Sequence, residues 1–157
     1  MEQLLLIFKN NILIAALLAW LIAQLIKVTI TVIVDHKFSF ERMFGDGGMP
    51  SGHSATVMAL ATATGIDQGL ASPLFALAML FAAVVMRDAC GVRREAGKQA
   101  SSIKELAEVM NSLLHEKDNA VKTEKLKVLV GHTPLQVVMG AIVGLATALL
   151  YMLVIIN

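Results

Sequence analysis

Residues 11–34, NILIAALLAWLIAQLIKVTITVIV, decide the fold, because this apolar run exceeds the roughly 20 residues that a helix needs to cross a bilayer. A second run of this kind, PLQVVMGAIVGLATALLYMLVII, occupies residues 134–156. Between the two lie shorter apolar segments, 53–65 and 71–86, joined by the turn-like IDQGLASP. We expect these two to form a hairpin of short helices, neither long enough to span comfortably alone. The pattern predicts an all-α membrane bundle of about four membrane helices.

The composition agrees with a membrane protein. Of the 157 residues, 57% are hydrophobic and 16% are charged, and the mean hydropathy is +0.72. A soluble bundle with fully buried helices is the alternative. The first run lacks an early basic flank and a small-residue cleavage site, so we expect it to remain in the mature protein. The one cysteine, Cys90, excludes an intramolecular disulfide.

Residues 98–127 differ from the rest of the chain, because they are charged and rich in helix formers. Apolar residues recur in this segment at helical spacing, at Ile103, Leu106, Val109 and Leu113. The pattern predicts an amphipathic extramembrane helix inserted in a single membrane-embedded domain, residues 1–157. The insertion is interpreted as a connector packed on the membrane domain, with a lid or an interface as alternatives.

The charges are distributed unevenly along the chain. Of the 13 Lys and Arg residues, all except Lys9 and Lys27 fall within residues 35–52 and 87–132. These two segments share one side of a four-helix topology, so the positive-inside rule predicts that this side is cytoplasmic. An anion-binding site would collect cations there as well. We expect an integral protein of a bacterial inner membrane, with the functional loops in the cytoplasm.

GDGGMPSGHSA, residues 45–55, places a histidine between two apolar stretches. Its glycines permit a tight backbone path, and Pro50 and Ser51 suit the start of a helix. His53 then falls in the first helical turn, where unpaired N–H groups and the helix dipole attract phosphate. A histidine at this place can donate a proton to a leaving oxygen. The alternative is a histidine that only caps a re-entrant turn.

GHTPLQVVMGAIVG, residues 131–144, sets a second histidine, His132, just before a helix. Thr133 resembles the cap, Pro134 the first helical residue, and Gln136 completes the spacing of a capping box. The topology therefore brings two histidines and two helix starts to one face of the membrane domain.

DACGVRREAGKQA, residues 88–100, lies near these histidines in the topology. It supplies Arg93 and Arg94, whose planar guanidinium groups can grip two phosphate oxygens at once, together with Asp88 and Glu95. Lys27 lies within the first apolar run, where a lysine needs a partner, a wet cavity or access to the interface. Its side chain is expected either to snorkel toward the interface or to bind phosphate.

Three blocks of the sequence resemble a known superfamily. PSGH at residues 50–53 resembles the second signature of the type 2 phosphatidic acid phosphatases and vanadium haloperoxidases, and HTPLQVVMGAIVG resembles the end of their third signature. GGMPSGHSA, DACGVRREAGKQA and GHTPLQVVMGA in this order resemble a divergent branch of small integral membrane proteins. The resemblance covers nearly the whole chain.

The resemblance implies a phosphatase that needs no metal and no cofactor. His132 would attack phosphorus to form a phosphohistidine, and His53 would protonate the leaving alkoxide. Ser51 and Gly52 match positions that help to cradle the phosphate. The implied substrate is a lipid phosphate monoester or pyrophosphate at the membrane, with no nucleic acid as a partner. A homodimer is expected because the chain has fewer helices than the superfamily usually has.

The chain also departs from the superfamily pattern. The first signature, a lysine followed by an Arg-Pro pair, has no match, and the Ser-Arg pair that usually precedes the nucleophile is missing. Gln136 stands where the family places an aspartate that orients the nucleophilic ring. Asp88, ahead of Glu95, is expected to replace that carboxylate; without a replacement, activity would be low. Gln136 is expected either to orient the ring or only to cap its helix. The alternative function is a non-catalytic protein that binds or translocates anionic lipids.

Overall fold

The computed structural model describes residues 6–35, 48–114 and 131–155, and the regular structure in these ranges is entirely helical. This result confirms the all-α prediction. The helices are η1 (Leu6–Lys9, 3-10), α2 (Asn11–Asp35), α4 (Gly52–Gln68), α5 (Pro73–Cys90), α6 (Val92–Leu114), α7 (Pro134–Leu150) and η3 (Tyr151–Ile155, π).

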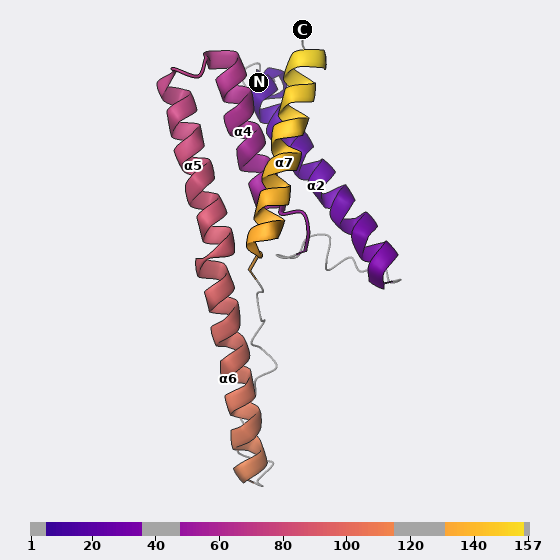
Figure 1. The fold of residues 1–157 in the computed structure, drawn as a ribbon, viewed down its shortest axis with the longest axis vertical. Coiled ribbons are helices and arrows are strands. Elements are labelled where there is room, and N and C mark those ends of the chain that lie inside the picture. The colour runs from indigo at the N-terminus through magenta and orange to yellow at the C-terminus, as the bar shows by residue number, and fades with distance from the viewer. Residues whose placement is uncertain (1–5, 36–47, 115–130, 156–157) are drawn as a thin grey trace.

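Helix α4 is the centre of the bundle and contacts α2, α5 and α7 (Figure 1). Its core is built from small side chains rather than large ones. Alanines four residues apart on α2 pack against alanines four residues apart on α4, and the fully buried members are Ala15, Ala19, Ala23, Ala55, Ala59 and Ala63. Small residues let helix backbones approach closely, which is how helices associate where lipid removes the hydrophobic driving force.

Helix α7 lies even closer to α4, because two glycines face it. A Cβ atom added at Gly140 would lie 2.3 Å from the carbonyl oxygen of Ser51, and one at Gly144 would lie 2.2 Å from that of Ala55. The backbone N–H of Ser51 also donates a hydrogen bond of 3.0 Å to the carbonyl oxygen of Gln136. The starts of α4 and α7 are therefore fixed side by side.

Three helical segments are long and apolar enough to cross a membrane: Asn11–Val34, Pro73–Leu113 and Pro134–Ile155. The expectation that neither central segment spans comfortably alone is wrong for the second, because α5 continues past the apolar run through Arg87 and Asp88. Helix α4 has 17 residues, or about 25 Å of rise, which is close to the roughly 30 Å of a hydrocarbon core. Leu80 of α5 is exposed on the chain and suits contact with lipid.

One end of the bundle gathers the segments that carry the sequence motifs. The end of α2, the starts of α4 and α7 and the junction of α5 with α6 lie there, whereas the α4–α5 turn and both ends of the chain lie at the other (Figure 1). Helix α6 extends away from the bundle and begins at Val92, earlier than the predicted Lys98. Residues 115–127 of the predicted insertion lie outside the described residues.

Candidate functional site

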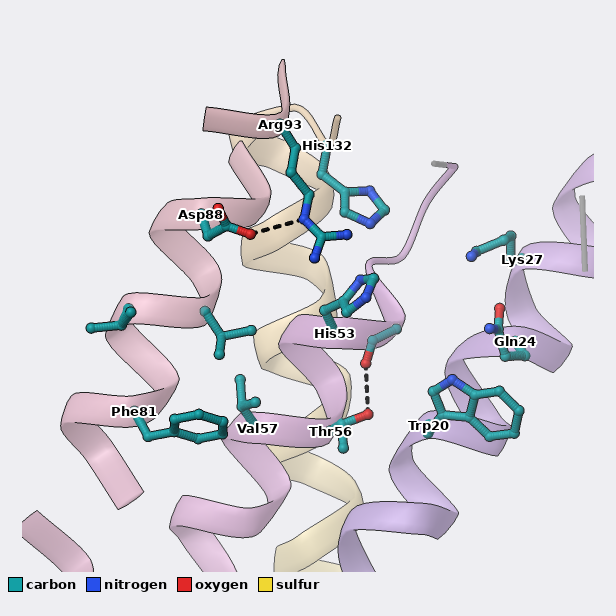
Figure 2. A pocket seen from close by; sticks show the side chains of 13 residues that line it. Trp20, Gln24, Lys27, His53, Thr56, Val57, Phe81, Asp88, Arg93 and His132 are labelled. Atoms are coloured by element: carbon teal, nitrogen blue, oxygen red, sulfur yellow. Dashed lines mark hydrogen bonds and ion pairs between the residues drawn. The ribbon is translucent and has the colours of Figure 1, made fainter. Parts of the chain in front are cut away.

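A pocket of about 670 Å³ opens at the motif-bearing end, with α4 as its floor and α2 and α5 as its walls (Figure 2). It is lined by Trp20, Gln24, Lys27, Gly52, His53, Thr56, Val57, Phe81, Val84, Val85, Asp88, Arg93 and His132. Four segments that are distant in sequence thus contribute polar groups to one cavity. Eight of these residues carry no ionisable side chain, and five of the eight have apolar side chains: Trp20, Val57, Phe81, Val84 and Val85.

His53 and His132 face one another in this pocket. Their ring centroids are 6.0 Å apart, and the ring planes are inclined at 65°. His53 is in the first turn of α4, whose start is capped by the Ser51 hydroxyl accepting a hydrogen bond of 3.3 Å from the Ser54 N–H. His132 is 4% exposed, and its backbone N–H donates to the Ala89 carbonyl oxygen at 3.0 Å. The two helix starts therefore present both rings to the same space.

Gln136 holds the ring of His132 and caps α7 at the same time. Its Oε1 accepts a hydrogen bond from the Thr133 backbone N–H at 3.0 Å and lies 3.3 Å from Nδ1 of His132. Because the Thr133 N–H identifies the shared amide atom as the oxygen, Nδ1 of His132 is the donor in this contact. This tautomer leaves the lone pair on Nε2. Gln136 therefore does more than cap its helix, because the same oxygen also contacts the ring of His132.

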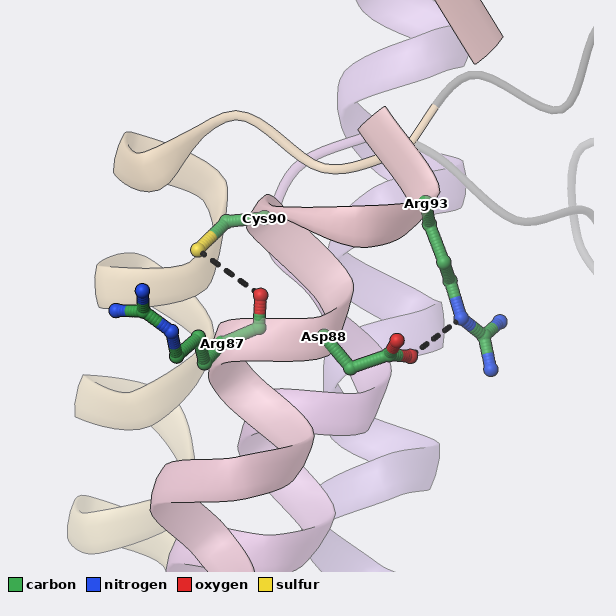
Figure 3. A network of polar contacts seen from close by, with 4 residues as sticks. All are labelled: Arg87, Asp88, Cys90 and Arg93. Atoms are coloured by element: carbon green, nitrogen blue, oxygen red, sulfur yellow. Dashed lines mark hydrogen bonds and ion pairs between the residues drawn. The ribbon is translucent and has the colours of Figure 1, made fainter. Parts of the chain in front are cut away.

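Arg93 supplies a guanidinium group to the pocket, and Asp88 positions it. Nε of Arg93 donates to Oδ2 of Asp88 at 2.8 Å, across the junction between α5 and α6 (Figures 2 and 3). Figure 2 shows the guanidinium group between Asp88 and the two histidines. Arg87, the residue before Asp88 on α5, points in a different direction (Figure 3). The carboxylate that was expected to support His132 directly therefore bonds to Arg93 instead.

Lys27 enters the pocket from α2 and is only 5% exposed. Gly48, at a φ of 80°, packs on its stem, because a Cβ at Gly48 would lie 3.3 Å from Cγ and Cδ of Lys27. The side chain is thus covered by the chain segment that leads into α4 rather than extended to solvent. Lys27 thus lines the same pocket as the two histidines.

Except for Gly52, the other predicted site residues lie outside the pocket lining. Ser51 is fully buried; its hydroxyl caps α4 by accepting from the Ser54 N–H, and its own N–H donates to the Gln136 carbonyl oxygen of α7. Glu95 forms an exposed ion pair of 2.6 Å with Lys98. The backbone of Arg94 lies against Gly131. Gly52 does line the pocket, and its N–H is among the first-turn donors that have no acceptor within the helix.

The apolar part of the pocket was not predicted. Trp20, Val57 and Phe81 lie on the side away from Arg93 and His132 (Figure 2). Trp20, Gln24 and Lys27 follow at helical spacing, so one face of α2 passes from an aromatic ring to a cation. That spacing was visible in the sequence, but an apolar helix carries many such faces. The pocket therefore combines a cationic end with a hydrocarbon-like end.

This arrangement suits an anion attached to an apolar group. Guanidinium and ammonium groups and first-turn N–H groups all favour phosphate oxygens. In the described part of the chain, no three His, Cys, Asp or Glu side chains are grouped so that they could hold a metal ion. The polar groups that converge in the pocket are chiefly nitrogen donors, with Asp88 engaged by one of them.

Comparison with known proteins agrees with the motif order. Residues 8–147 match the Divergent PAP2 family. The chain is 42% identical over 149 residues to the uncharacterized membrane protein YuiD of Bacillus subtilis (strain 168), covering 91% of this chain and 94% of that protein. No solved structure matches the chain. By the family match and by this relative, the chain is a membrane protein that belongs to the Divergent PAP2 family.

Proposed function

We propose that the protein hydrolyses a lipid phosphate through a phosphohistidine intermediate. The observation that carries the proposal is the pair of facing histidines, 6.0 Å apart between ring centroids, in a pocket that Arg93 and Lys27 also line. A nucleophile in near-attack position is about 3–3.5 Å from its target atom. A general acid is about 2.6–3.2 Å from the atom it protonates. The 6.0 Å separation joins the ring centres, and both rings border the pocket that Arg93 and Lys27 also line, so a phosphoryl group held there by the two cations lies beside both histidines.

In the first step, the lone pair on Nε2 of His132 attacks phosphorus. The bond between phosphorus and the substrate's bridging oxygen breaks, and His53 gives its proton to that oxygen, which leaves as an alcohol or, from a pyrophosphate, as a phosphate. Arg93, Lys27 and the N–H groups at the start of α4 stabilise the negative charge on the phosphoryl oxygens. Asp88 holds the guanidinium group in place through its bond to Nε.

In the second step, His53 accepts a proton from a water molecule that attacks the phosphohistidine. The bond between phosphorus and Nε2 breaks, inorganic phosphate is released, and His132 regains its lone pair. Gln136 keeps the ring oriented in both steps, because its Oε1 accepts from Nδ1. An amide carries no charge, so it stabilises the cationic phosphohistidine less than the carboxylate of related enzymes would.

The substrate is proposed to be a lipid phosphate because the cationic end of the pocket continues into an apolar one. The phosphate would meet the site at the level of the lipid headgroups, and the hydrocarbon would lie among the helices. The excess of Lys and Arg at this end of the bundle favours a cytoplasmic site in a bacterial inner membrane. A homodimer remains part of the proposal.

The test is phosphate release by the purified protein from a panel of lipid phosphates and pyrophosphates. We expect turnover that His132→Ala abolishes. His53→Ala should slow release of a poor alkoxide leaving group far more than release of a phenolate, because only the former needs protonation. Equal losses with both leaving groups would remove His53 from the acid role, and full turnover by His132→Ala would remove the nucleophile.

Gln136 favours a second candidate function, binding or translocation of anionic lipids without turnover, because the amide lacks the charge of the family's aspartate. The same panel separates the two functions. A binder would retain specific affinity for lipid phosphates, weakened by changes at Arg93 and Lys27, and would release no phosphate from any of them.

A further inference from the structure

A second cavity adjoins the candidate site. It measures about 450 Å³ and shares Phe81 with the first pocket. Its lining consists of Ile12, Leu60, Thr64, Gln68, Leu74, Leu77, Ala78 and Phe81. These residues come from the same three helices that form the first pocket, α2, α4 and α5, and they lie farther from the histidines along α4. We call this cavity the tail groove.

The register of the helices places the two cavities end to end, with Phe81 lining both. On α5, Leu74, Leu77 and Phe81 follow one another at helical spacing, and the same stripe continues to Val84 and Asp88 in the first pocket. On α4, the corresponding stripe runs from His53 past Leu60 to Gln68. One face of each helix therefore lines the whole path from the histidines to the opposite end of the bundle.

A single helix forms the floor of the tail groove, and the groove follows that helix over most of its length. Helix α4 is its floor, and α2 and α5 contact opposite sides of α4. From His53 to Gln68 the path along α4 rises about 22 Å. Half of a hydrocarbon core is about 15 Å, so a chain that starts at the histidines passes the bilayer midplane before the groove ends.

We infer that the tail groove binds the hydrocarbon chain of the phosphorylated substrate, and that this substrate carries one long chain rather than two. The inference rests on the proposed function, because it extends the same site. Phe81, at the junction, contacts the chain where it leaves the first pocket. A cavity of similar size, about 470 Å³, lies on the other side of α4 between α5 and α7, and neither histidine lines it. An apolar cavity alone therefore does not identify the tail site. The tail groove is identified because it adjoins the cationic pocket.

Trp20 provides a binding readout that does not depend on turnover. It is the one tryptophan of the chain and lines the first pocket. In nanodiscs of neutral lipid, a single-chain alkyl phosphate brominated near its phosphate should quench Trp20 fluorescence saturably. A long single-chain phosphate should displace this probe at least tenfold more effectively than a short-chain phosphate or a diacyl phosphate. Equal displacement by the diacyl phosphate, or independence of chain length, would overturn the inference.

Matched variants then locate the chain. Ala78→Leu fills the tail groove, whereas Ala76→Leu adds the same group to an exposed position on α5 outside the groove. We expect Ala78→Leu to weaken long-chain binding at least tenfold relative to short-chain binding, and Ala76→Leu to leave that ratio unchanged. Leu77→Phe, at a side chain that is 65% exposed, repeats the test without disturbing the helix contacts. Unchanged ratios in both groove variants would refute the tail groove.

The outcomes separate this inference from the proposed function. Selective, saturable binding of long-chain phosphates without phosphate release from any substrate would support the tail groove and refute hydrolysis. Phosphate release that is indifferent to chain length and to Ala78→Leu would support hydrolysis and refute the groove.

Discussion

Replacing Gly140 by alanine tests whether the close approach of α7 to α4 positions the two histidines. The added Cβ would lie 2.3 Å from the Ser51 carbonyl oxygen and 2.9 Å from Cβ of Ser54, whereas real contacts of a Cβ essentially never fall below 3.0 Å. The nearest obstacle is backbone, which no rotamer change can clear. Helix α7 must therefore move away from α4 by at least about 0.7 Å, the difference between the 3.0 Å limit and the 2.3 Å contact with the Ser51 oxygen.

This retreat has two measurable effects. Overpacking of a tight contact costs about 1–3 kcal/mol of unfolding free energy, which is partly offset by about 1 kcal/mol because alanine favours a helix more than glycine does. The displacement also stretches the bond from the Ser51 N–H to the Gln136 carbonyl oxygen and separates His132 from His53. A misplacement of about 1 Å costs on the order of a hundredfold in rate. We therefore expect turnover to fall by about this factor at temperatures where the variant is still folded.

The assay pairs thermal unfolding in detergent, followed by circular dichroism, with phosphate release below the unfolding temperature. Gly69→Ala is the control, because Gly69 has a φ of 84° with open space around it and lies at the end of α4 far from the histidines. Backbone strain there should cost about 1–3 kcal/mol and leave turnover unchanged. Wild-type turnover in Gly140→Ala, or equal loss of turnover in both variants, would refute the positioning argument.

Further changes test the polar groups. Gln136→Glu keeps both hydrogen bonds and adds a charge beside Nδ1, so turnover should rise about tenfold or more; a decrease would show that another carboxylate already acts there. Arg93→Lys removes the planar guanidinium group and should lower kcat/KM about tenfold or more. Asp88→Asn only weakens the bond that holds this group, so it should lower kcat/KM less; a larger loss in Asp88→Asn would contradict these roles. Ser102→Cys in a Cys90→Ser background should resist an impermeant thiol reagent in intact cells and react after lysis, whereas labelling in intact cells would place the site outside.

The starts of α4 and α7 were predictable because capping signals are local. Ser51 is a typical N-cap residue, and Thr133 is followed by Pro134 and Gln136 at the spacing of a capping box; the structure has both caps. The histidines could be placed on one face because an even number of crossings returns the chain to the same side. Both features can be predicted from neighbouring residues and from the number of membrane crossings alone.

The choice between Arg93 and Arg94 was not predictable, because it depends on how α6 is rotated relative to α5. The helix axis is interrupted at Gly91, and the rotation there directs Arg93 toward Asp88 and the pocket. Periodicity failed for a related reason in the core. Helices that are apolar on all faces show no preferred side, so the alanine contacts between α2 and α4 leave no hydrophobic signal.

Trapping the phosphoenzyme tests the central claim most directly. Purified protein is mixed with a lipid phosphate labelled in its phosphoryl group, quenched in alkali to preserve phosphohistidine, and the labelled peptide is sequenced. We expect label on His132 and no label in His132→Ala. With a phenolate-leaving substrate, His53→Ala should accumulate more label, because the second step then lacks its base. Phosphate release with label on another residue, or undiminished release by His132→Ala, would contradict it.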